Sequence, residues 1–191
     1  MSRPAVFLDR DGTIIKDFGS LTDLDAMELL PGAADAIRML TEAGYPVVVI
    51  TNQAGVARGL FDEAHVEAAH TALRETVSLG GGRIDAFYYC PHHPTESVEE
   101  RYRVACDCRK PAPGMLRQAA ADLDLDLPNS WMVGDWWRDV QAGIAAGAHA
   151  ILLRSGHGGL HGQAPVPPVR PDAILDNLME ATEWILRNSP R

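Results

Sequence analysis

The sequence has few cysteines, no long apolar run and no excess of positive charge. A membrane-spanning helix needs roughly 18–20 consecutive apolar residues, and no run in this chain approaches that length. Residues Met1–Pro4 lead directly into an apolar segment and lack the apolar core and small-residue cleavage site of a signal peptide. We therefore expect a cytoplasmic protein that makes no membrane contact.

Basic residues are too few for a nucleic-acid-binding protein. There are 17 Lys and Arg against 26 Asp and Glu, a net charge of −9, and no basic patch that could follow a phosphate backbone. The chain has 191 residues, 46% of them hydrophobic, without an internal repeat or an obvious linker. We expect one domain over residues 1–191, acting as a monomer. An acidic enzyme with an anionic substrate would need metal ions and a few placed cations.

Apolar, β-branched runs alternate with helical patterns along the chain. Strands are predicted at residues 5–8, 46–51, 86–89, 131–134 and 150–153. Helices are predicted at residues 31–43, 63–79 after an Asp62 cap, 113–125, 139–146 and 175–187, with a Gly-, His- and Pro-rich loop at 155–171. This alternation predicts an α/β fold, a three-layer Rossmann-like parallel sheet with helices on both faces. No insertion is long enough for a large cap domain.

Chemically reactive side chains follow several of the predicted strands. In an open parallel sheet, ligands bind beyond the carboxyl ends of the strands. An Asp-x-Asp-Gly alone is often a turn, and a single threonine or lysine is often structural or solvated. The set of strand ends is what indicates a site, with a lysine before a helix able to reach it: Asp9, Asp11, Thr51, Asn52, Gln53, Asp135 and Lys110.

These residue types suit the hydrolysis of a phosphomonoester. Asp9 can attack phosphorus and form an acyl phosphate, and Asp11 can protonate the leaving oxygen and then activate water. Mg²⁺ prefers oxygen ligands, so Asp9, Asp135 and a nearby backbone carbonyl could hold it. Thr51 and Lys110 would contact the transferring phosphoryl group.

At these residues the chain resembles the haloacid dehalogenase superfamily of phosphatases. The matching segments are residues 7–13, 48–52, 109–111 and 133–135 with Asp139. The resemblance implies that Asp9 is the nucleophile and a Mg²⁺ ligand. It also implies that Asp11 is the acid/base and gives its backbone carbonyl to the metal, with Asp135 as the third protein ligand.

Within that superfamily the chain is similar to the family of D-glycero-D-manno-heptose-1,7-bisphosphate 7-phosphatases. Residues 52–59, 88–94 and 106–116 carry this likeness. It implies removal of the C7 phosphate from a phosphorylated sugar in nucleotide-activated heptose synthesis. The substrate-binding residues it implies include a recognition arginine and a phosphoryl-stabilising lysine, in the set Asp17, Gly19, Ser20, Asn52, Gln53, Arg109 and Lys110.

Two positions depart from that family's pattern, and two other functions stay open. Ser20 stands where a tyrosine is common, and Trp136 stands where a lysine is common. We expect Trp136 and Trp137 to pack the following helix rather than to stack on a sugar. A histidinol-phosphate phosphatase resembles the chain in its first motif and its zinc loop. A catalytically inactive sugar-phosphate-binding module is the alternative of another class.

All three cysteines lie in one short stretch, together with a histidine pair. Cys90, His92, Cys106 and Cys108 form a Cys₃His set suited to tetrahedral, structural Zn²⁺. His93 is the alternative to His92, and scattered buried thiols are the alternative to a metal site. We expect a zinc-bound loop at about residues 90–110. His157 and His161, in a glycine-rich loop, are expected to be solvated rather than metal-bound.

Overall fold

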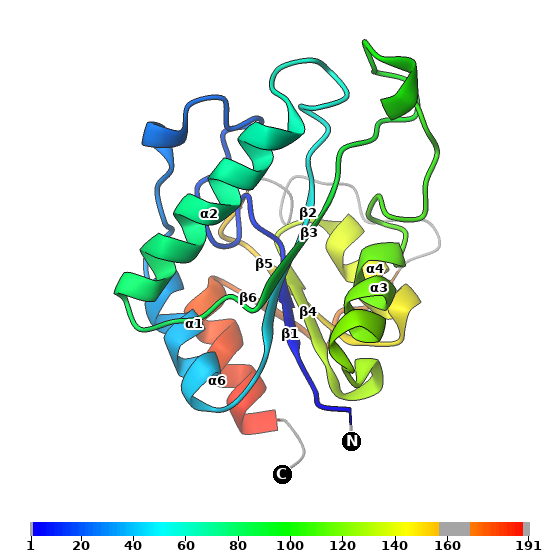
Figure 1. The fold of residues 1–191 in the computed structure, drawn as a ribbon. Helices are drawn as coiled ribbons and strands as arrows, with labels where there is room; N and C mark the ends of the chain where they lie inside the picture. The colour runs from blue at the N-terminus through cyan, green and yellow to red at the C-terminus, as the bar shows by residue number, and fades with distance from the viewer. Residues whose placement is uncertain (1, 157–168, 189–191) are drawn as a thin grey trace.

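Parallel strands form a single sheet in the order β3-β2-β1-β4-β5-β6 (Figure 1). The structure is a computed structural model that describes residues 2–156 and 169–188. Its strands are β1 (Val6–Leu8), β2 (Val47–Asn52), β3 (Ala86–Cys90), β4 (Trp131–Gly134), β5 (His149–Leu153) and β6 (Ala173–Leu175).

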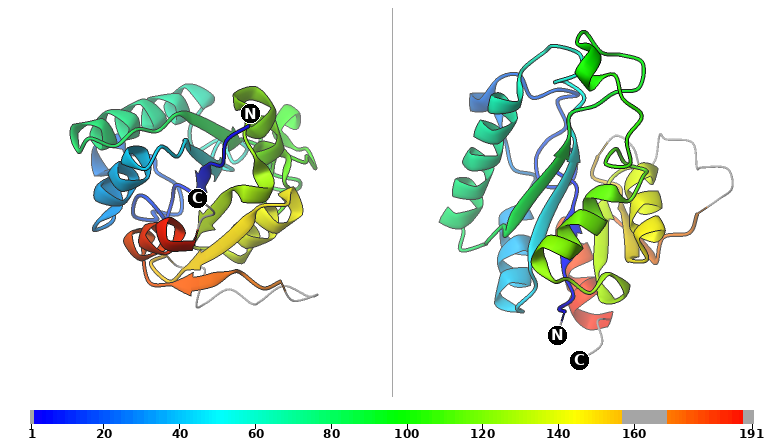
Figure 2. Two further views of the ribbon diagram at one scale, coloured as in Figure 1. Left: turned by 90° about the horizontal axis from the view of Figure 1, so that it is seen from below. Right: turned by 45° about the vertical axis from the view of Figure 1, so that its right-hand side comes forward.

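Helices cover both faces of the sheet. On one face lie α1 (Ala33–Glu42), α2 (Glu63–Leu79) and α6 (Leu178–Asn188); on the other lie α3 (Gly114–Leu123) and α4 (Trp137–Ala146) (Figure 2). Short 3₁₀ helices occur at η1 (Leu24–Ala26), η2 (Glu100–Tyr102) and η3 (Leu127–Asn129). This confirms the predicted three-layer α/β fold. In the described part of the chain, no helix is both long and apolar enough to cross a membrane.

The central strands are buried on both faces, which explains their continuous apolar runs. Along β1, Val6 and Leu8 pack into the cluster under α1, α2 and α6, whereas Phe7 packs into the cluster under α3. The same alternation continues in β2, where Val49 faces the first cluster and Val48 the second. Each strand therefore supplies both halves of the core.

The strand order reverses beside β1. Leu8 pairs with Val49 of β2 on one side and with Val133 of β4 on the other. The two neighbours of β1 are thus strands from distant parts of the sequence, and their carboxyl ends meet at the same edge of the sheet. That edge is the switch point at which open α/β sheets bind ligands.

The end of the chain differs from the predicted pattern. Residues 173–175, expected to lie within or beside the last helix, instead add the edge strand β6 to β5. The helix begins later because Asn177 caps it, its Oδ1 accepting the Glu180 N–H at 3.0 Å. The middle of the expected loop at 155–171, with His157 and His161, lies outside the described residues.

A substitution at Gly143 tests how tightly α4 packs against β4. A Cβ added at Gly143 would lie 2.6 Å from the Met132 Cβ. Although alanine favours a helix, the overlap should make Gly143→Ala about 1–3 kcal/mol less stable to urea. Ile144→Ala, on the exposed side of the same turn, should change stability by no more than about 0.5 kcal/mol. Unchanged stability in Gly143→Ala would mean that α4 can move away from the sheet at little cost.

Candidate active site

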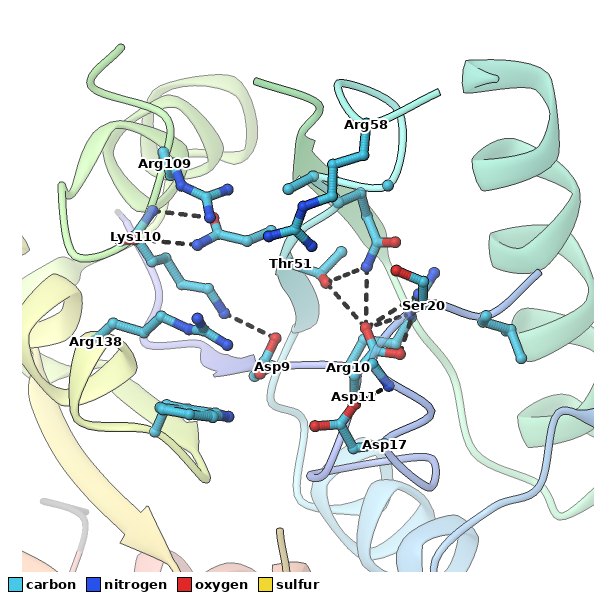
Figure 3. A pocket seen from close by; sticks show the side chains of 17 residues that line it. Asp9, Arg10, Asp11, Asp17, Ser20, Thr51, Arg58, Arg109, Lys110 and Arg138 are labelled. Carbon is cyan, nitrogen blue, oxygen red and sulfur yellow. Dashed lines mark hydrogen bonds and ion pairs between the residues drawn. The ribbon is translucent and has the colours of Figure 1, made fainter. Parts of the chain in front are cut away.

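A buried ion-pair cluster lies at the carboxyl ends of β1 and β4. Asp9 follows β1, and its N–H donates to the Val133 carbonyl at 2.9 Å. The Lys110 Nζ lies 2.8 Å from Asp9 Oδ1 and 2.7 Å from Asp139 Oδ1 (Figure 3). It also donates to the Ile50 carbonyl at 2.7 Å, and the lysine is only 2% exposed. One ammonium group therefore joins three segments that are far apart in the sequence: the end of β1, β2 and the start of α4.

Further hydrogen bonds fix the positions of Lys110 and Asp139. Asn52, at the end of β2, accepts from the Lys110 N–H and donates to the Lys110 carbonyl, both at 3.0 Å. Asp139, in the first turn of α4, accepts from the Trp136 N–H through Oδ2 at 2.9 Å. The asparagine positions the lysine backbone, and the helix start positions the second carboxylate.

Asp9, Asp135 and Asp139 form a group that could hold a metal ion, with ligand atoms within 4.8 Å of one another. Both Asp135 oxygens are buried without a hydrogen-bond partner in the described chain. Space for this carboxylate depends on glycine, because a Cβ at Gly12, whose φ is +82°, would lie 2.5 Å from Asp135 Oδ2. Three ionised carboxylates facing one ammonium leave two uncompensated negative charges, which matches a single divalent cation.

Burial, together with the neighbouring charges, shifts the pKa values of the cluster. Burial raises the pKa of Asp135 to about 8, with the nearby charges of Asp9 and Asp139 adding to the effect. Burial also raises the pKa of Asp9 to about 6, although Lys110 opposes the shift. Burial alone would lower the pKa of Lys110, but its ion pairs with Asp139 and Asp9 outweigh this and raise it. A cation that binds here would stabilise the ionised carboxylates.

Asp11 lies beside this cluster and is held by its own set of donors. Arg10 forms an ion pair with it at 3.0 Å, and Gln53 Nε2 donates to its Oδ2 at 3.0 Å. The Thr51 hydroxyl lies 3.5 Å from the same oxygen and accepts from Gln53 at 2.8 Å. Thr51 and Gln53, predicted as substrate contacts, thus also orient the candidate acid/base.

A pocket of about 210 Å³ opens over Asp9 and Asp11. Asp135 lies outside its wall and is fully buried. The Asp17 carboxylate accepts from the Gly19 N–H at 2.7 Å and shapes the loop beside the pocket. The structure brings every predicted substrate residue into the pocket lining: Asp17, Gly19, Ser20, Thr51, Asn52, Gln53, Arg109 and Lys110.

The sequence reasoning missed several pocket residues. Arg10, Arg58 and Arg138 line the pocket without having been proposed as site residues. Trp137 packs against the apolar cluster under α4, as expected. Trp136 contacts the same helix through Arg138, but it also lies in the pocket wall, which was not expected. The helix begins at Trp137 rather than Asp139, which places Arg138 in its first turn. Asp139, an acidic residue three positions after Trp136 that closes the helix start, is the sequence signal that could have indicated this.

The four predicted zinc ligands lie together at the end of β3. The Sγ atoms of Cys106 and Cys108 are 2.9 Å apart, and Cys90 Sγ lies 3.2 Å from that of Cys108. His92 Nδ1 is 3.4 Å from Cys108 Sγ. The neighbouring His93 instead accepts from a loop N–H at 2.9 Å. Burial and the adjacent Cys108 thiol raise the pKa of Cys106, a cost that a bound Zn²⁺ would remove.

The cysteine cluster is linked to the pocket through the residues that follow it. Arg109 comes directly after Cys108 and donates from Nη1 to the His92 carbonyl at 3.1 Å. The predicted zinc-bound loop, residues 90–110, is an insertion after β3. Within the insertion, Tyr102 donates to Glu63 of α2 at 2.6 Å. Glu96 pairs with Arg58 at 2.8 Å. The insertion therefore contacts the protein at several points around the pocket.

Comparisons with known proteins agree with this fold. A family model described as haloacid dehalogenase-like hydrolase matches residues 6–76, and one described as HAD-hydrolase-like matches residues 107–181. The first contains Asp9, and the second contains Lys110, Asp135 and Asp139. Fold and site together define a hydrolase of the haloacid dehalogenase-like class.

More similar relatives define a narrower group. The chain is 42% identical to the D-glycero-β-D-manno-heptose-1,7-bisphosphate 7-phosphatase of Escherichia coli K12, over 98% of this chain and 90% of the relative. It is 47% identical to that of Salmonella typhi, over 81% and 82%. A solved D,D-heptose 1,7-bisphosphate phosphatase from B. bronchiseptica, complexed with magnesium and phosphate, superposes with a TM-score of 0.83 at 36% identity, covering 97% of this chain and 99% of that one. The chain belongs to the family of D-glycero-β-D-manno-heptose-1,7-bisphosphate 7-phosphatases.

The raised pKa of Asp135 makes the stability of the Mg²⁺-free protein depend on pH. Folded protein keeps this proton up to about pH 8, whereas the unfolded chain releases it near the ordinary value of 3.8. Because the folded state binds more protons in between, its stability should fall as the pH rises, by at most about 1.4 kcal/mol per pH unit for one proton. Urea unfolding of zinc-loaded protein without Mg²⁺, between about pH 5 and pH 8, measures this slope.

Mg²⁺ should flatten that slope, and so should Asp135→Asn, which removes the titrating group. Asp25→Asn makes the same chemical change at an exposed position and should leave the slope as it is. Equal slopes in the parent and in Asp135→Asn would show that another group controls the pH dependence.

Loss of a zinc ligand should affect both folding and the pocket. Cys106→Ala should lose bound zinc, lower stability by roughly 2 kcal/mol or more and raise KM for a phosphomonoester, since Arg109 and Lys110 follow the last ligand. His93→Ala should keep zinc near the parent content. Zinc content by atomic absorption and steady-state kinetics measure these effects; a folded, zinc-free variant with unaltered KM would contradict the link to the pocket.

Proposed function

We propose that this chain is a Mg²⁺-dependent phosphatase that removes the C7 phosphate of D-glycero-D-manno-heptose 1,7-bisphosphate through a phosphoryl-aspartate at Asp9. The observation that carries the proposal is the buried carboxylate of Asp9, at the floor of the pocket and 2.8 Å from the Lys110 ammonium. The relatives with this function match nearly the whole chain. Nucleotide-activated heptose synthesis is the process that needs such a reaction.

In the first half of the reaction, Asp9 attacks phosphorus. A bond forms between its carboxylate oxygen and phosphorus, and the bond from phosphorus to the C7 oxygen breaks. Asp11 gives its proton to the leaving oxygen, so the dephosphorylated sugar departs as an alcohol. Lys110 stabilises the charge on the phosphoryl oxygens while it keeps Asp9 in place.

In the second half, water attacks the phosphoryl-aspartate. Asp11, now ionised, takes a proton from that water, and the bond between Asp9 and phosphorus breaks to release inorganic phosphate. Arg10, Gln53 and Thr51 orient Asp11 for this proton transfer, because all three contact its carboxylate. Asp11 therefore ends the cycle protonated, as it began.

The carboxylates fit a catalytic Mg²⁺. Asp9 and Asp135, with the backbone carbonyl of Asp11, would hold it, while Asp139 is engaged with Lys110. When bound, Mg²⁺ neutralises the repulsion between an ionised nucleophile and a phosphate dianion. The Cys₃His cluster would hold a structural Zn²⁺, because its four protein ligands leave no position for substrate.

The wall of the pocket suits a small, highly anionic sugar. Arg58, Arg109 and Arg138 line it beside Lys110, although the whole chain carries a net charge of −9. This local concentration of cations is the arrangement that an acidic enzyme needs for a phosphorylated substrate. We propose further that residues 1–191 form one domain, because both helical layers share a single sheet. We also propose that the chain acts in the cytoplasm, as a monomer.

Asp9→Asn should abolish the reaction without unfolding the protein. Phosphate release from the bisphosphate should fall by about a thousandfold or more, because both steps pass through this carboxylate. Circular dichroism and zinc content should match the parent. Asp25→Asn, the same change at an exposed site, should keep full activity.

The substrate is tested by kcat/KM for both anomers of the heptose bisphosphate and for histidinol phosphate. We expect the sugar to be preferred. A preference of more than about tenfold for histidinol phosphate would reassign the substrate, and no Mg²⁺-dependent release from any phosphate ester would indicate a binding module without turnover.

A further inference from the structure

Arg138 occupies an unusual position in the pocket. It lies in the first turn of α4, beside the Asp139 that holds Lys110. Its guanidinium stacks over the Trp136 ring, with the central carbon 4.5 Å from the ring centroid. In Figure 3 it reaches toward Lys110 and Asp9 from the side opposite Asp11 and Ser20. Arg138 thus lies on a helix, whereas Arg10, Arg58 and Arg109, the other arginines of the pocket, lie in loops.

Among the described residues, Arg138 also differs from the other pocket cations in having no protein acceptor. Arg10 pairs with Asp11, Arg58 with Glu96, and Lys110 with Asp9 and Asp139, while Arg109 donates to a backbone carbonyl. Within residues 2–156 and 169–188, Arg138 forms no ion pair, and its buried Nε has no hydrogen-bond partner. A buried donor without an acceptor is costly unless a ligand supplies one.

The surrounding charges favour an anionic ligand. Arg58, Arg109 and Arg138 line the same pocket, together with Lys110. Guanidinium groups that repel one another around a cavity are stabilised when an anion binds between them. Stacking on Trp136 occupies one face of Arg138 and leaves its N–H edge available for bidentate contact with a phosphate.

We propose that Arg138, held flat on Trp136, binds the second, non-transferring phosphate of the substrate. This inference rests on the proposed function, in which the substrate carries two phosphates. The transferring phosphate would lie at Asp9, where Lys110 and a bound Mg²⁺ would neutralise it. The other phosphate needs a cation of its own, and Arg138 is the pocket arginine that has no acceptor among the described residues, whereas Arg58 and Arg109 each donate to one. Arg138 is thus a specificity-determining residue.

Kinetics with one and with two phosphates separate this role from others. Arg138→Ala should raise KM for the heptose 1,7-bisphosphate about 10- to 100-fold, the range expected for lost charge-assisted hydrogen bonds, with kcat changed only a few-fold. KM for the heptose 7-phosphate should stay near the parent value. Arg138→Lys, which keeps the charge, should recover part of the loss. Arg187→Ala removes an exposed arginine and controls for net charge.

Direct binding gives a readout that does not need turnover. By calorimetry, Arg138→Ala should weaken binding of heptose 1-phosphate at least tenfold and leave the affinity for inorganic phosphate unchanged. If both affinities fall together, or both substrates lose equally in the kinetics, Arg138 serves the transferring phosphate and the proposal is wrong. Unchanged binding of heptose 1-phosphate also overturns it. An inactive parent that still binds heptose 1-phosphate through Arg138 would refute the proposed function alone.

Discussion

The buried ammonium of Lys110 is the group on which the site depends. It holds Asp9 and Asp139 at 2.8 and 2.7 Å and donates to the Ile50 carbonyl. These partners follow β1, begin α4 and lie in β2, so a single side chain fixes three segments relative to one another. Without it, two buried carboxylates would face each other without compensation, which costs several kcal/mol. The geometry of the nucleophile is therefore inseparable from the charge balance of the core.

The backbone of this lysine is held as well as its side chain. Its backbone is bound on both sides by Asn52, and it lies two residues after the last cysteine of the zinc cluster. The insertion is polar and has little core of its own, so a metal can stabilise what packing does not. Reactive groups thus lie on rigid strand ends, whereas the arginines that face a substrate come from the loops and from the start of α4. Chemistry and recognition are carried by different parts of the chain.

Much of this arrangement could be predicted because parallel strands end at a common edge. Asp9, Thr51 and Asp135 were found for that reason, and the four metal-binding side chains because all the cysteines lie in one stretch. The clamp between Asn52 and Lys110 could not be, since it joins residues 58 positions apart through the path of a loop. Arg138 was missed because its role depends on where α4 begins and on a stacked side-chain conformation, and neither follows from periodicity. The edge strand β6 has three residues, too few to give a pattern.

The central position of β1 has a consequence for how the enzyme is made. Asp9 is synthesised well before its lysine partner, which is 101 residues further along the chain. Until β4 and α4 leave the ribosome, β1 can pair with β2 alone and presents an open edge on its other side. A nascent chain that stops before residue 139 therefore contains the nucleophile but lacks the second carboxylate that holds Lys110. The site is completed only after β4 and the first turn of α4 have been synthesised.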